Sequence, residues 1–297
     1  MPMDRTVTPQ PSPATFSVSV IVPAFDEADR LAATLAALQR ALEPVWPGAF
    51  ELVVVDDGSS DATLEVALRA ADRLPRCTVV SYAGNRGKGY ALRRGFAAAR
   101  GDVVAFFDAD GEVAAEEVVP MLLEAQRGVS VVVGRRRWLA RRPLLRRVAS
   151  RIVSFTAATV FRLEVPESQA GIKAFVRADV ESPVRACRED GFLFDLELLV
   201  RARREGLVMT SVDVTTTVVR PCRIGLGAGA RELARLTRLW WRLGRRSVGD
   251  AVRGVDTPVP AGHVLRPRSA GAHHVRQADG SAQPLLARAR GSYEDAA

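Results

Sequence analysis

The stretch DVVAFFDADGE, residues 102–112, joins a strongly apolar segment directly to three acidic residues. Its first part, DVVAFFDAD (102–110), has the length and the apolar content of a buried β-strand. In an extended backbone, side chains two residues apart point the same way, so Asp108, Asp110 and Glu112 are predicted to lie on one side. Three like charges at that spacing repel one another unless positive charge lies among them. The stretch therefore predicts either a cation site at the end of a buried strand or a solvated polar turn.

Outward from this stretch, strand-like and helix-like segments alternate along the chain. The apolar segments predict strands at 17–25, 51–57, 78–82, 102–110 and 129–136. The segments with apolar residues at helical spacing predict helices at 27–42, from 62 onward, at 89–100 and at 116–128. Near-continuously apolar strands that alternate with helices are typical of a mostly parallel sheet covered on both faces. The expected fold class is therefore α/β.

Two segments of the C-terminal half combine clustered arginines with apolar residues, and each is predicted to be a basic amphipathic helix, at 141–161 and 230–246. The second is typical of core packing against a sheet, with an interfacial membrane helix as the alternative. Residues 207–219 between them are predicted to be extended. We expect a disordered arm, one folded domain and a disordered tail, at 1–15, 16–250 and 251–297.

Composition limits the chemistry that the folded part can perform. The chain has 297 residues, 47% hydrophobic and 26% charged, which fits a globular protein of one large domain or two small ones. Its three cysteines are far apart and lack CxxC spacing, so neither a disulfide framework nor a zinc site is indicated. All three histidines lie in the predicted tail. Carboxylates, hydroxyls, lysine, arginine or a bound metal must therefore carry any catalysis.

The location and the partners are predicted from hydrophobicity and charge. No run reaches the roughly 18 apolar residues of a membrane-spanning helix, and the first residues lack a signal-peptide pattern, so we expect a cytoplasmic protein. The net charge is +8 and comes almost entirely from arginine, which is compatible with nucleic acid, an anionic membrane or a phosphate-bearing substrate. Nucleic-acid binding is disfavoured because the arginines are interleaved with leucine and no recognition motif is present.

Polar residues gather where the predicted parallel strands end, which is where such sheets bind ligands. The first strand ends in Pro23 to Glu27, the second in Asp56 and Asp57, and the fourth in the acidic stretch. Asp57 could accept hydrogen bonds from a nucleotide or could serve ordinary turn chemistry. Asp108 and Asp110 suit Mg²⁺ or Mn²⁺, which take oxygen ligands.

A glycine-rich segment and an arginine cluster complete the candidate features. Residues 85–89, NRGKG, open a predicted helix with a lysine, Lys88, and suggest a pyrophosphate site. They match neither the P-loop nor the GxGxxG pattern. The arginines at 135, 136, 146, 147 and 151 either form a solvated face or bind an acceptor phosphate.

Seven segments, in this order, resemble family 2 glycosyltransferases of the GT-A fold, which is Rossmann-like. They are VIVPAFDEADRL, VVVDDGSSDAT, NRGKGYALRRG, FFDADGE, VVVGRR, ESQAGIKAF and FDLELL, and together they span about residues 17 to 245. The chain is most similar to the branch of dolichyl-phosphate glucosyltransferases and polyprenyl-phosphate sugar synthases. The resemblance implies a UDP- or GDP-hexose donor, a divalent metal and inversion at the anomeric carbon.

The resemblance, together with the polar strand ends, the segment 85–89 and the arginine cluster, assigns expected roles to individual residues. The resemblance places the metal on Asp108, Asp110 and Glu112. The donor nucleotide is expected to contact Pro23, Glu27, Asp57, Lys88 and Asp108. The acceptor phosphate is expected at Arg136, Arg147 and Arg151. The catalytic set on the sugar and acceptor side is expected to be Asp110, Gln169, Asp195 and Glu197.

The expected function is transfer of a hexose, with glucose favoured, to a polyprenyl phosphate by a peripheral protein at the inner face of the membrane. Such an acceptor oxygen is already largely ionised, since its second pKa is about 6, and it needs no general base. A hydroxyl acceptor would need a carboxylate such as Asp195 to take its proton. The alternatives are a soluble glycosyltransferase that acts on a hydroxyl group and a non-catalytic module that binds nucleotide sugars or membranes.

Overall fold

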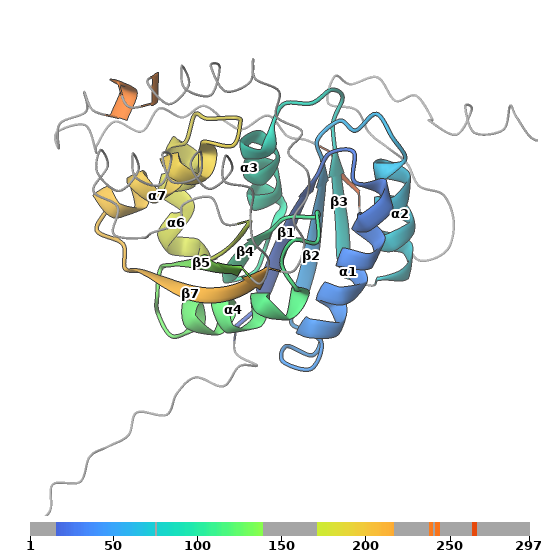
Figure 1. The fold of residues 1–297 in the computed structure, drawn as a ribbon, viewed down its shortest axis with the longest axis horizontal. Helices are drawn as coiled ribbons and strands as arrows, with labels where there is room; N and C mark the ends of the chain where they lie inside the picture. Colours follow the sequence, from blue (N-terminus) through green and yellow to red (C-terminus); the bar gives the residue numbers. More distant parts are fainter. Residues whose placement is uncertain are drawn as a thin grey trace, which may run out of the picture.

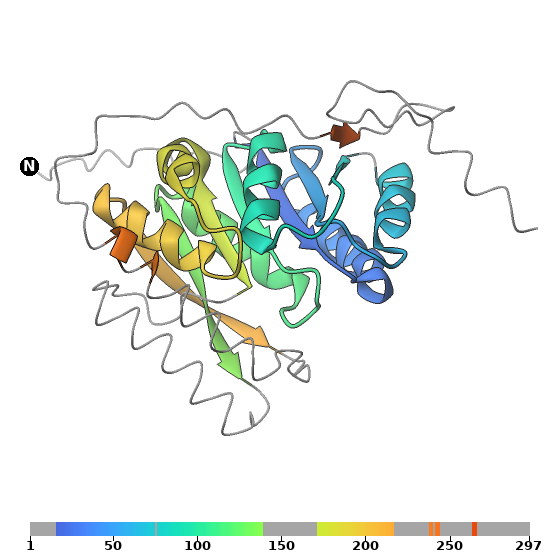
Figure 2. The same ribbon diagram turned by 90° about the horizontal axis from the view of Figure 1, so that it is seen from above.

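The computed structural model describes residues 16–74, 76–138, 171–216, 238–239, 241–243 and 263–265. They form three layers, with one mixed β-sheet between two sets of helices (Figures 1 and 2). The expected α/β architecture, a mostly parallel sheet with helices on both faces, is confirmed.

The sheet has eight strands among the described residues, in the order β7-β5-β6-β4-β1-β2-β3-β8. Their bounds are Val18–Ala24 (β1), Phe50–Asp56 (β2), Cys77–Ser81 (β3), Val103–Phe107 (β4), Val131–Trp138 (β5), Ile172–Val176 (β6), Met209–Thr216 (β7) and His263–Leu265 (β8). Strands β6 and β8 run antiparallel to their neighbours, and the other strand pairs are parallel. The carboxyl ends of β1, β2, β3 and β4 therefore meet at one edge of the sheet.

Helices cover both faces because the strands are apolar on both sides. One face carries α1 (Ala28–Leu42), α2 (Thr63–Arg73), the 3-10 helix η2 (Ala115–Glu117) and α4 (Val118–Gln126), and the other carries α3 (Lys88–Ala98), α6 (Arg177–Ala186) and α7 (Phe194–Arg204) (Figure 1). Along β1, Val20 and Val22 belong to the first core and Ile21 to the second. Two buried faces explain why the strands read as continuous apolar runs.

The acidic stretch differs from its prediction. Strand β4 ends at Phe107, so Asp108, Asp110 and Glu112 lie in a turn and do not alternate along a strand. The turn forms because the Glu112 N–H donates to Asp110 Oδ1 at 3.0 Å and Gly111 takes a φ of +71°. A side chain that binds its own backbone two residues on competes with strand pairing.

The C-terminal predictions are only partly covered by the described residues. Strand β7 lies within the predicted extended segment, and β8 forms within the predicted disordered tail by pairing with β3. In the predicted helix 230–246, Leu239 and Leu243 are buried in the second core, as expected for a segment that packs against the sheet. Trp241 is 55% exposed. The predicted helix 141–161 lies outside the described residues. Among the helices described, none is both long and apolar enough to span a bilayer.

Helix α3 packs unusually close to the sheet at Gly95, and this contact gives a stability prediction. A Cβ added there would overlap Ile21 Cγ2 and lie 3.0 Å from Val55 Cγ2. Alanine normally stabilises a helix interior by about 1 kcal/mol relative to glycine. Gly95→Ala should instead lower the free energy of unfolding, by about 1–3 kcal/mol, because the helix must move off the strands. Urea denaturation measures the difference.

The exposed Ala97 on the same helix provides the matched control. Ala97→Gly should cost only the helix propensity of about 1 kcal/mol. A Gly95→Ala protein that is more stable than the parent would show that α3 has room to accept the methyl group.

Candidate active site

The candidate site lies where β1, β2 and β4 end and where α3 and α7 begin. Asp57 follows β2 and Asp108 follows β4, and each is mostly or partly buried. Lys88 is the first residue of α3, and Asp195 is the second residue of α7. Two strands and two helix N-termini thus bring together residues that are far apart in the sequence.

Hydrogen bonds between neighbouring segments and the backbone of the acidic turn hold it in place. The Asp108 N–H donates to the Gly171 carbonyl at 2.9 Å, which keeps the turn attached to β6. From α1, Thr34 Oγ1 donates to the Ala109 carbonyl at 3.1 Å and Arg30 donates to the Asp110 carbonyl at 2.8 Å. The Asp108 carboxyl group packs against Gly171, where an added Cβ would overlap Oδ2.

Lys88 supplies positive charge among the acidic groups. Its Nζ lies 2.7 Å from Asp108 Oδ1 and 3.7 Å from Asp195 Oδ2. Burial alone would lower the pKa of Lys88, but Asp108, Asp195 and Asp110 more than offset this and raise it. Burial raises the pKa of Asp108, and Lys88 opposes that rise. The cluster of carboxylates therefore stabilises a cation at this point.

Lys173 of β6 extends the cluster into the core. It is 1% exposed, and its Nζ lies 3.2 Å from Asp195 Oδ1. Burial lowers the pKa of Lys173, and Asp195 offsets only part of that effect. Asp195 is therefore placed between two ammonium groups. Lys88 and Lys173 are the only lysines of the chain, and that rarity is the one sequence signal that could have pointed to Lys173.

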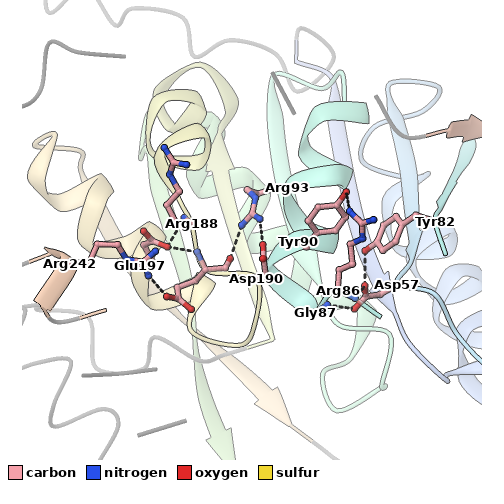
Figure 3. Close-up of polar contacts among 11 residues, drawn as sticks. Asp57, Tyr82, Arg86, Gly87, Tyr90, Arg93, Arg188, Asp190, Glu197 and Arg242 are labelled. Carbon is pink, nitrogen blue, oxygen red and sulfur yellow. Dashed lines mark hydrogen bonds and ion pairs between the residues drawn. The ribbon is translucent and has the colours of Figure 1, made fainter. Parts of the chain in front are cut away.

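Asp57 organises the loop between β3 and α3. Its Oδ1 accepts hydrogen bonds from Tyr82 Oη and the Arg86 N–H, both at 2.8 Å, and its Oδ2 accepts one from the Gly87 N–H at 2.8 Å (Figure 3). The Arg86 guanidinium stacks over the Tyr90 ring at 5.0 Å. The structure thus gives Asp57 the turn chemistry that the sequence left open, and contact with a nucleotide stays a prediction.

The segment 85–89 does not present a free phosphate cradle, in contrast with its prediction. Its Arg86 and Gly87 amides bind Asp57, and the Gly89 N–H donates to the Asp190 carbonyl at 2.7 Å. The two glycines serve close packing, because a Cβ at Gly87 would overlap the Asp190 carbonyl oxygen and one at Gly89 would lie 2.5 Å from the Glu189 carbonyl oxygen. The N–H groups of Arg86, Gly87 and Gly89 are thus already used by the chain, and this helix end contributes the Lys88 side chain to the site.

Glu197 has a supporting role rather than the predicted catalytic one. Its side chain is fully buried. One carboxyl oxygen accepts the N–H groups of Arg188 and Glu189 at 2.9 and 2.8 Å, and the other accepts Arg201 Nε and a second Arg201 nitrogen at 3.0 and 2.6 Å. Arg93 and Arg242 bind the same loop through Asp190 and Glu189 (Figure 3). Glu197 therefore holds the loop that packs on α3.

Of the other residues predicted for the site, some have a described position and some lie outside the described part of the chain. Glu112 faces Arg136, with Oε2 3.7 Å from the nearest guanidinium nitrogen. Pro23 lies in β1, and the Glu27 N–H donates to Thr63 Oγ1 at 2.8 Å. The predicted residues that lie outside the described part of the chain are Gln169, Arg147 and Arg151.

The donor set at the acidic turn suits a hard cation held by few protein ligands. Within the described ranges, no group of three or more His, Cys, Asp or Glu side chains converges to hold a metal. Lys88 Nζ nevertheless shows that the carboxylates of Asp108 and Asp195 attract positive charge. Mg²⁺ and Mn²⁺ are commonly bound by one or two carboxylates together with the phosphates of a substrate. The residues fit such a cation.

Comparisons with known proteins agree on one family. A family model described as Glycosyl transferase family 2 matches residues 19–179. Glycosyltransferase AglD of Haloferax volcanii is 32% identical over 254 residues, which cover 81% of this chain and 40% of AglD. A dolichyl-phosphate beta-glucosyltransferase of Drosophila melanogaster is 31% identical over 226 residues, which cover 69% of this chain and 68% of that protein.

A solved structure shares the fold. It is glucosyl-3-phosphoglycerate synthase from Mycobacterium tuberculosis in complex with Mn²⁺, uridine-diphosphate and glucosyl-3-phosphoglycerate. The TM-score is 0.62 at 23% identity, and the match covers 84% of this chain and 88% of that one. The likeness supports the layered fold described above.

The supporting role of Glu197 gives a stability prediction. Glu197→Gln removes the charge that Arg201 pairs with in a buried position, and it should lower the free energy of unfolding by about 3–5 kcal/mol. Glu181→Gln is the matched control, because Glu181 pairs with Arg185 on the surface of α6 and should cost less than about 1 kcal/mol. Urea denaturation of both variants tests the difference. Similar small losses in the two variants would show that the loop does not depend on Glu197.

Proposed function

The chain belongs to glycosyl transferase family 2, and from that premise we propose that it transfers a hexose from a nucleotide sugar to a polyprenyl phosphate at the cytoplasmic face of a membrane. The donor is a UDP- or GDP-hexose, with UDP-glucose favoured, and a divalent metal takes part. The observation that carries the proposal is the position of Asp195 between Lys88 and Lys173, next to Asp108. Dolichyl-phosphate beta-glucosyltransferases among the relatives support the choice of acceptor.

The donor side of the proposal rests on the acidic turn. Asp108 and Asp110 would hold Mn²⁺ or Mg²⁺, which supplies charge neutralisation at the departing diphosphate. Lys88, at the start of α3, adds a second positive group within reach of the same carboxylates. The structural neighbour in complex with Mn²⁺ and uridine-diphosphate supports a uridine nucleotide here.

The choice of acceptor in this proposal depends on the ion pairs that Asp195 makes with Lys88 and Lys173. Its two oxygens face two ammonium groups, and the side chain is only 6% exposed. Both carboxyl oxygens are thus occupied by ion pairs, which are costly to break in a poorly solvated place. Asp195 is therefore not proposed as a general base. A phosphate acceptor brings an oxygen that is already ionised, so the reaction proceeds without one.

Arg136 is proposed to bind the acceptor phosphate. It lies on β5 at the edge of the site, partly buried and near Glu112, and a guanidinium group matches phosphate oxygens bidentately. Arg147 and Arg151 are proposed for the same role on sequence grounds alone. A phosphate that pairs with Arg136 would compete with Glu112 for the guanidinium group.

Peripheral contact with the membrane is proposed from two exposed aromatic side chains. Phe192 is 62% exposed and Trp241 is 55% exposed. Their neighbours Gly191, Arg238 and Arg242 line one pocket together with Arg188, Glu189 and Asp190, so the aromatic residues lie beside arginines in a region of mixed charge. Aromatic and arginine side chains together favour the interface of an anionic bilayer.

A small acceptor with a hydroxyl group is the second candidate. It is favoured by the structural neighbours, one of which is in complex with glucosyl-3-phosphoglycerate. Such an acceptor would require a base, and the ion pairs of Asp195 weigh against that role.

The first prediction for function concerns donor, metal and acceptor together. With Mn²⁺, the protein should transfer glucose from UDP-glucose to a short polyprenyl phosphate, and 3-phosphoglycerate should not replace the lipid. Asp110→Ala should lower kcat/KM by on the order of 10²- to 10³-fold, because charge on the leaving group is no longer stabilised. Glu116→Gln, an exposed carboxylate nearby, is the control and should keep full activity.

Two results would contradict the proposal. Turnover with 3-phosphoglycerate in the absence of lipid would favour the second candidate. Failure to bind any UDP- or GDP-sugar, with or without metal, would leave only a non-catalytic module.

The second prediction separates the acceptor from the donor. Arg136→Ala should raise the KM for polyprenyl phosphate about tenfold or more, since a charge-assisted hydrogen bond contributes about 1.5–3 kcal/mol. The KM for UDP-glucose should change little. Arg135→Ala is the matched control, because the neighbouring Arg135 is exposed and pairs with Asp213. Equal effects of the two variants on the lipid would remove Arg136 from the acceptor site.

A further inference from the structure

Lys173 occupies an unusual position for a lysine. It lies on β6, paired in register with Phe106 of β4 and Val133 of β5. The flanking strand positions Phe106, Val133 and Phe175 belong to the second core, which α3 and α7 cover. An ammonium group is thus almost fully buried on an apolar face of the sheet.

The fold alone does not require a charge at this position. Replacing a buried ion pair by well-packed apolar side chains is often neutral or stabilising, whereas removing one partner costs several kcal/mol. A methionine or leucine at position 173 and a neutral residue at 195 would fill the same space. The charged pair of Lys173 and Asp195 is therefore better explained by what it does to its neighbours than by stability.

Its neighbours form a chain of alternating charge that leads from the core to the candidate site. The order is Lys173, Asp195, Lys88 and Asp108, with Nζ–Oδ distances of 3.2, 3.7 and 2.7 Å. The side-chain exposure rises along it from 1% through 6% and 16% to 28%. The four residues come from β6, α7, α3 and the turn after β4, so each position is fixed by a different element.

We propose that Lys173 is a positioning residue, which holds Asp195 so that Lys88 is shared between Asp195 and Asp108. The inference rests on the proposed function, because the shared Lys88 is the group that a divalent cation at Asp108 must displace. With Lys173 present, Asp195 divides its attraction between two ammonium groups and draws Lys88 only weakly. Lys173 thereby sets how readily Asp108 exchanges its ammonium partner for the metal.

If Lys173 has this role, its removal should strengthen metal binding and slow turnover. Without Lys173, Asp195 would pair with Lys88 alone and draw it away from Asp108. Asp108 would then bind the metal more tightly, while Asp195 and Lys88 would leave the positions that the transfer requires. A residue that only stabilises the fold would weaken metal binding and turnover together.

The test compares the full-length protein with Lys173→Met by Mn²⁺ electron paramagnetic resonance, with Mn²⁺ alone and with Mn²⁺ plus UDP. Mn²⁺ affinity should rise about three- to tenfold, because Lys88 then competes less strongly for Asp108. The kcat for glucose transfer should fall at least about tenfold, with little change in the KM for UDP-glucose. Circular dichroism and thermal melting confirm that each variant is folded.

Two further variants keep the test decisive if Lys173→Met unfolds. Lys173→Gln retains a hydrogen-bond donor to Asp195 without the charge and should shift Mn²⁺ affinity in the same direction. The charge-balanced double variant Lys173→Met/Asp195→Asn should fold well, and its Mn²⁺ affinity should return to that of the parent or below it, because Lys88 then stays on Asp108.

The outcomes separate this inference from the proposed function. Unchanged or weaker Mn²⁺ binding in a folded Lys173 variant would overturn the positioning role and leave the transferase intact. The same holds if the double variant keeps the tighter binding of the single one. A parent protein that binds neither Mn²⁺ nor Mn²⁺ with UDP would overturn both.

Discussion

Carboxylates cannot gather at the end of a sheet without positive charge among them, and Lys88 satisfies that constraint here. Asp108 follows β4 and Asp195 lies at the start of α7, and the Lys88 ammonium group that contacts both relieves their mutual repulsion. In a poorly solvated place this attraction is strong, and so is the cost of leaving either sign alone. The placement of α3, which begins with Lys88, is therefore tied to the chemistry of the turn after β4.

The same constraint accounts for the loop that precedes α7. Lys88 reaches the acids only if the start of α3 lies against the start of α7, and the two are joined by the backbone of residues 189–191. Glu197 and Arg93 hold that backbone from either side. Charged residues such as Glu197, for which the sequence suggested a catalytic role, thus keep the starts of α3 and α7 in contact.

Much of the fold could be read from the sequence, and the reasons for the rest are local. Strands buried on both faces leave continuous apolar runs, so β1 to β5 were predicted close to their observed bounds. The antiparallel β6 was not, because a lysine interrupts its apolar pattern. The end of β4 was placed too late because alternation of acids looks the same in a strand and in a turn closed by Asp110. For the site, single residues such as Asp108 were found from type and spacing, whereas the partners of Glu197 depend on contacts between distant segments that no spacing reveals.

The connection between α6 and α7 illustrates how a surface loop can lose the freedom that loops usually have. Loops on a surface ordinarily accept insertions and changes of length. Here the carbonyl groups of Glu189 and Asp190 receive donors from α3, and two glycines on the facing segment leave no space for a shifted backbone. A single inserted residue would move those carbonyls out of register with the start of α3. Length variation between relatives with this packing is therefore expected to accumulate elsewhere on the chain, and this loop should keep its length although its side chains vary.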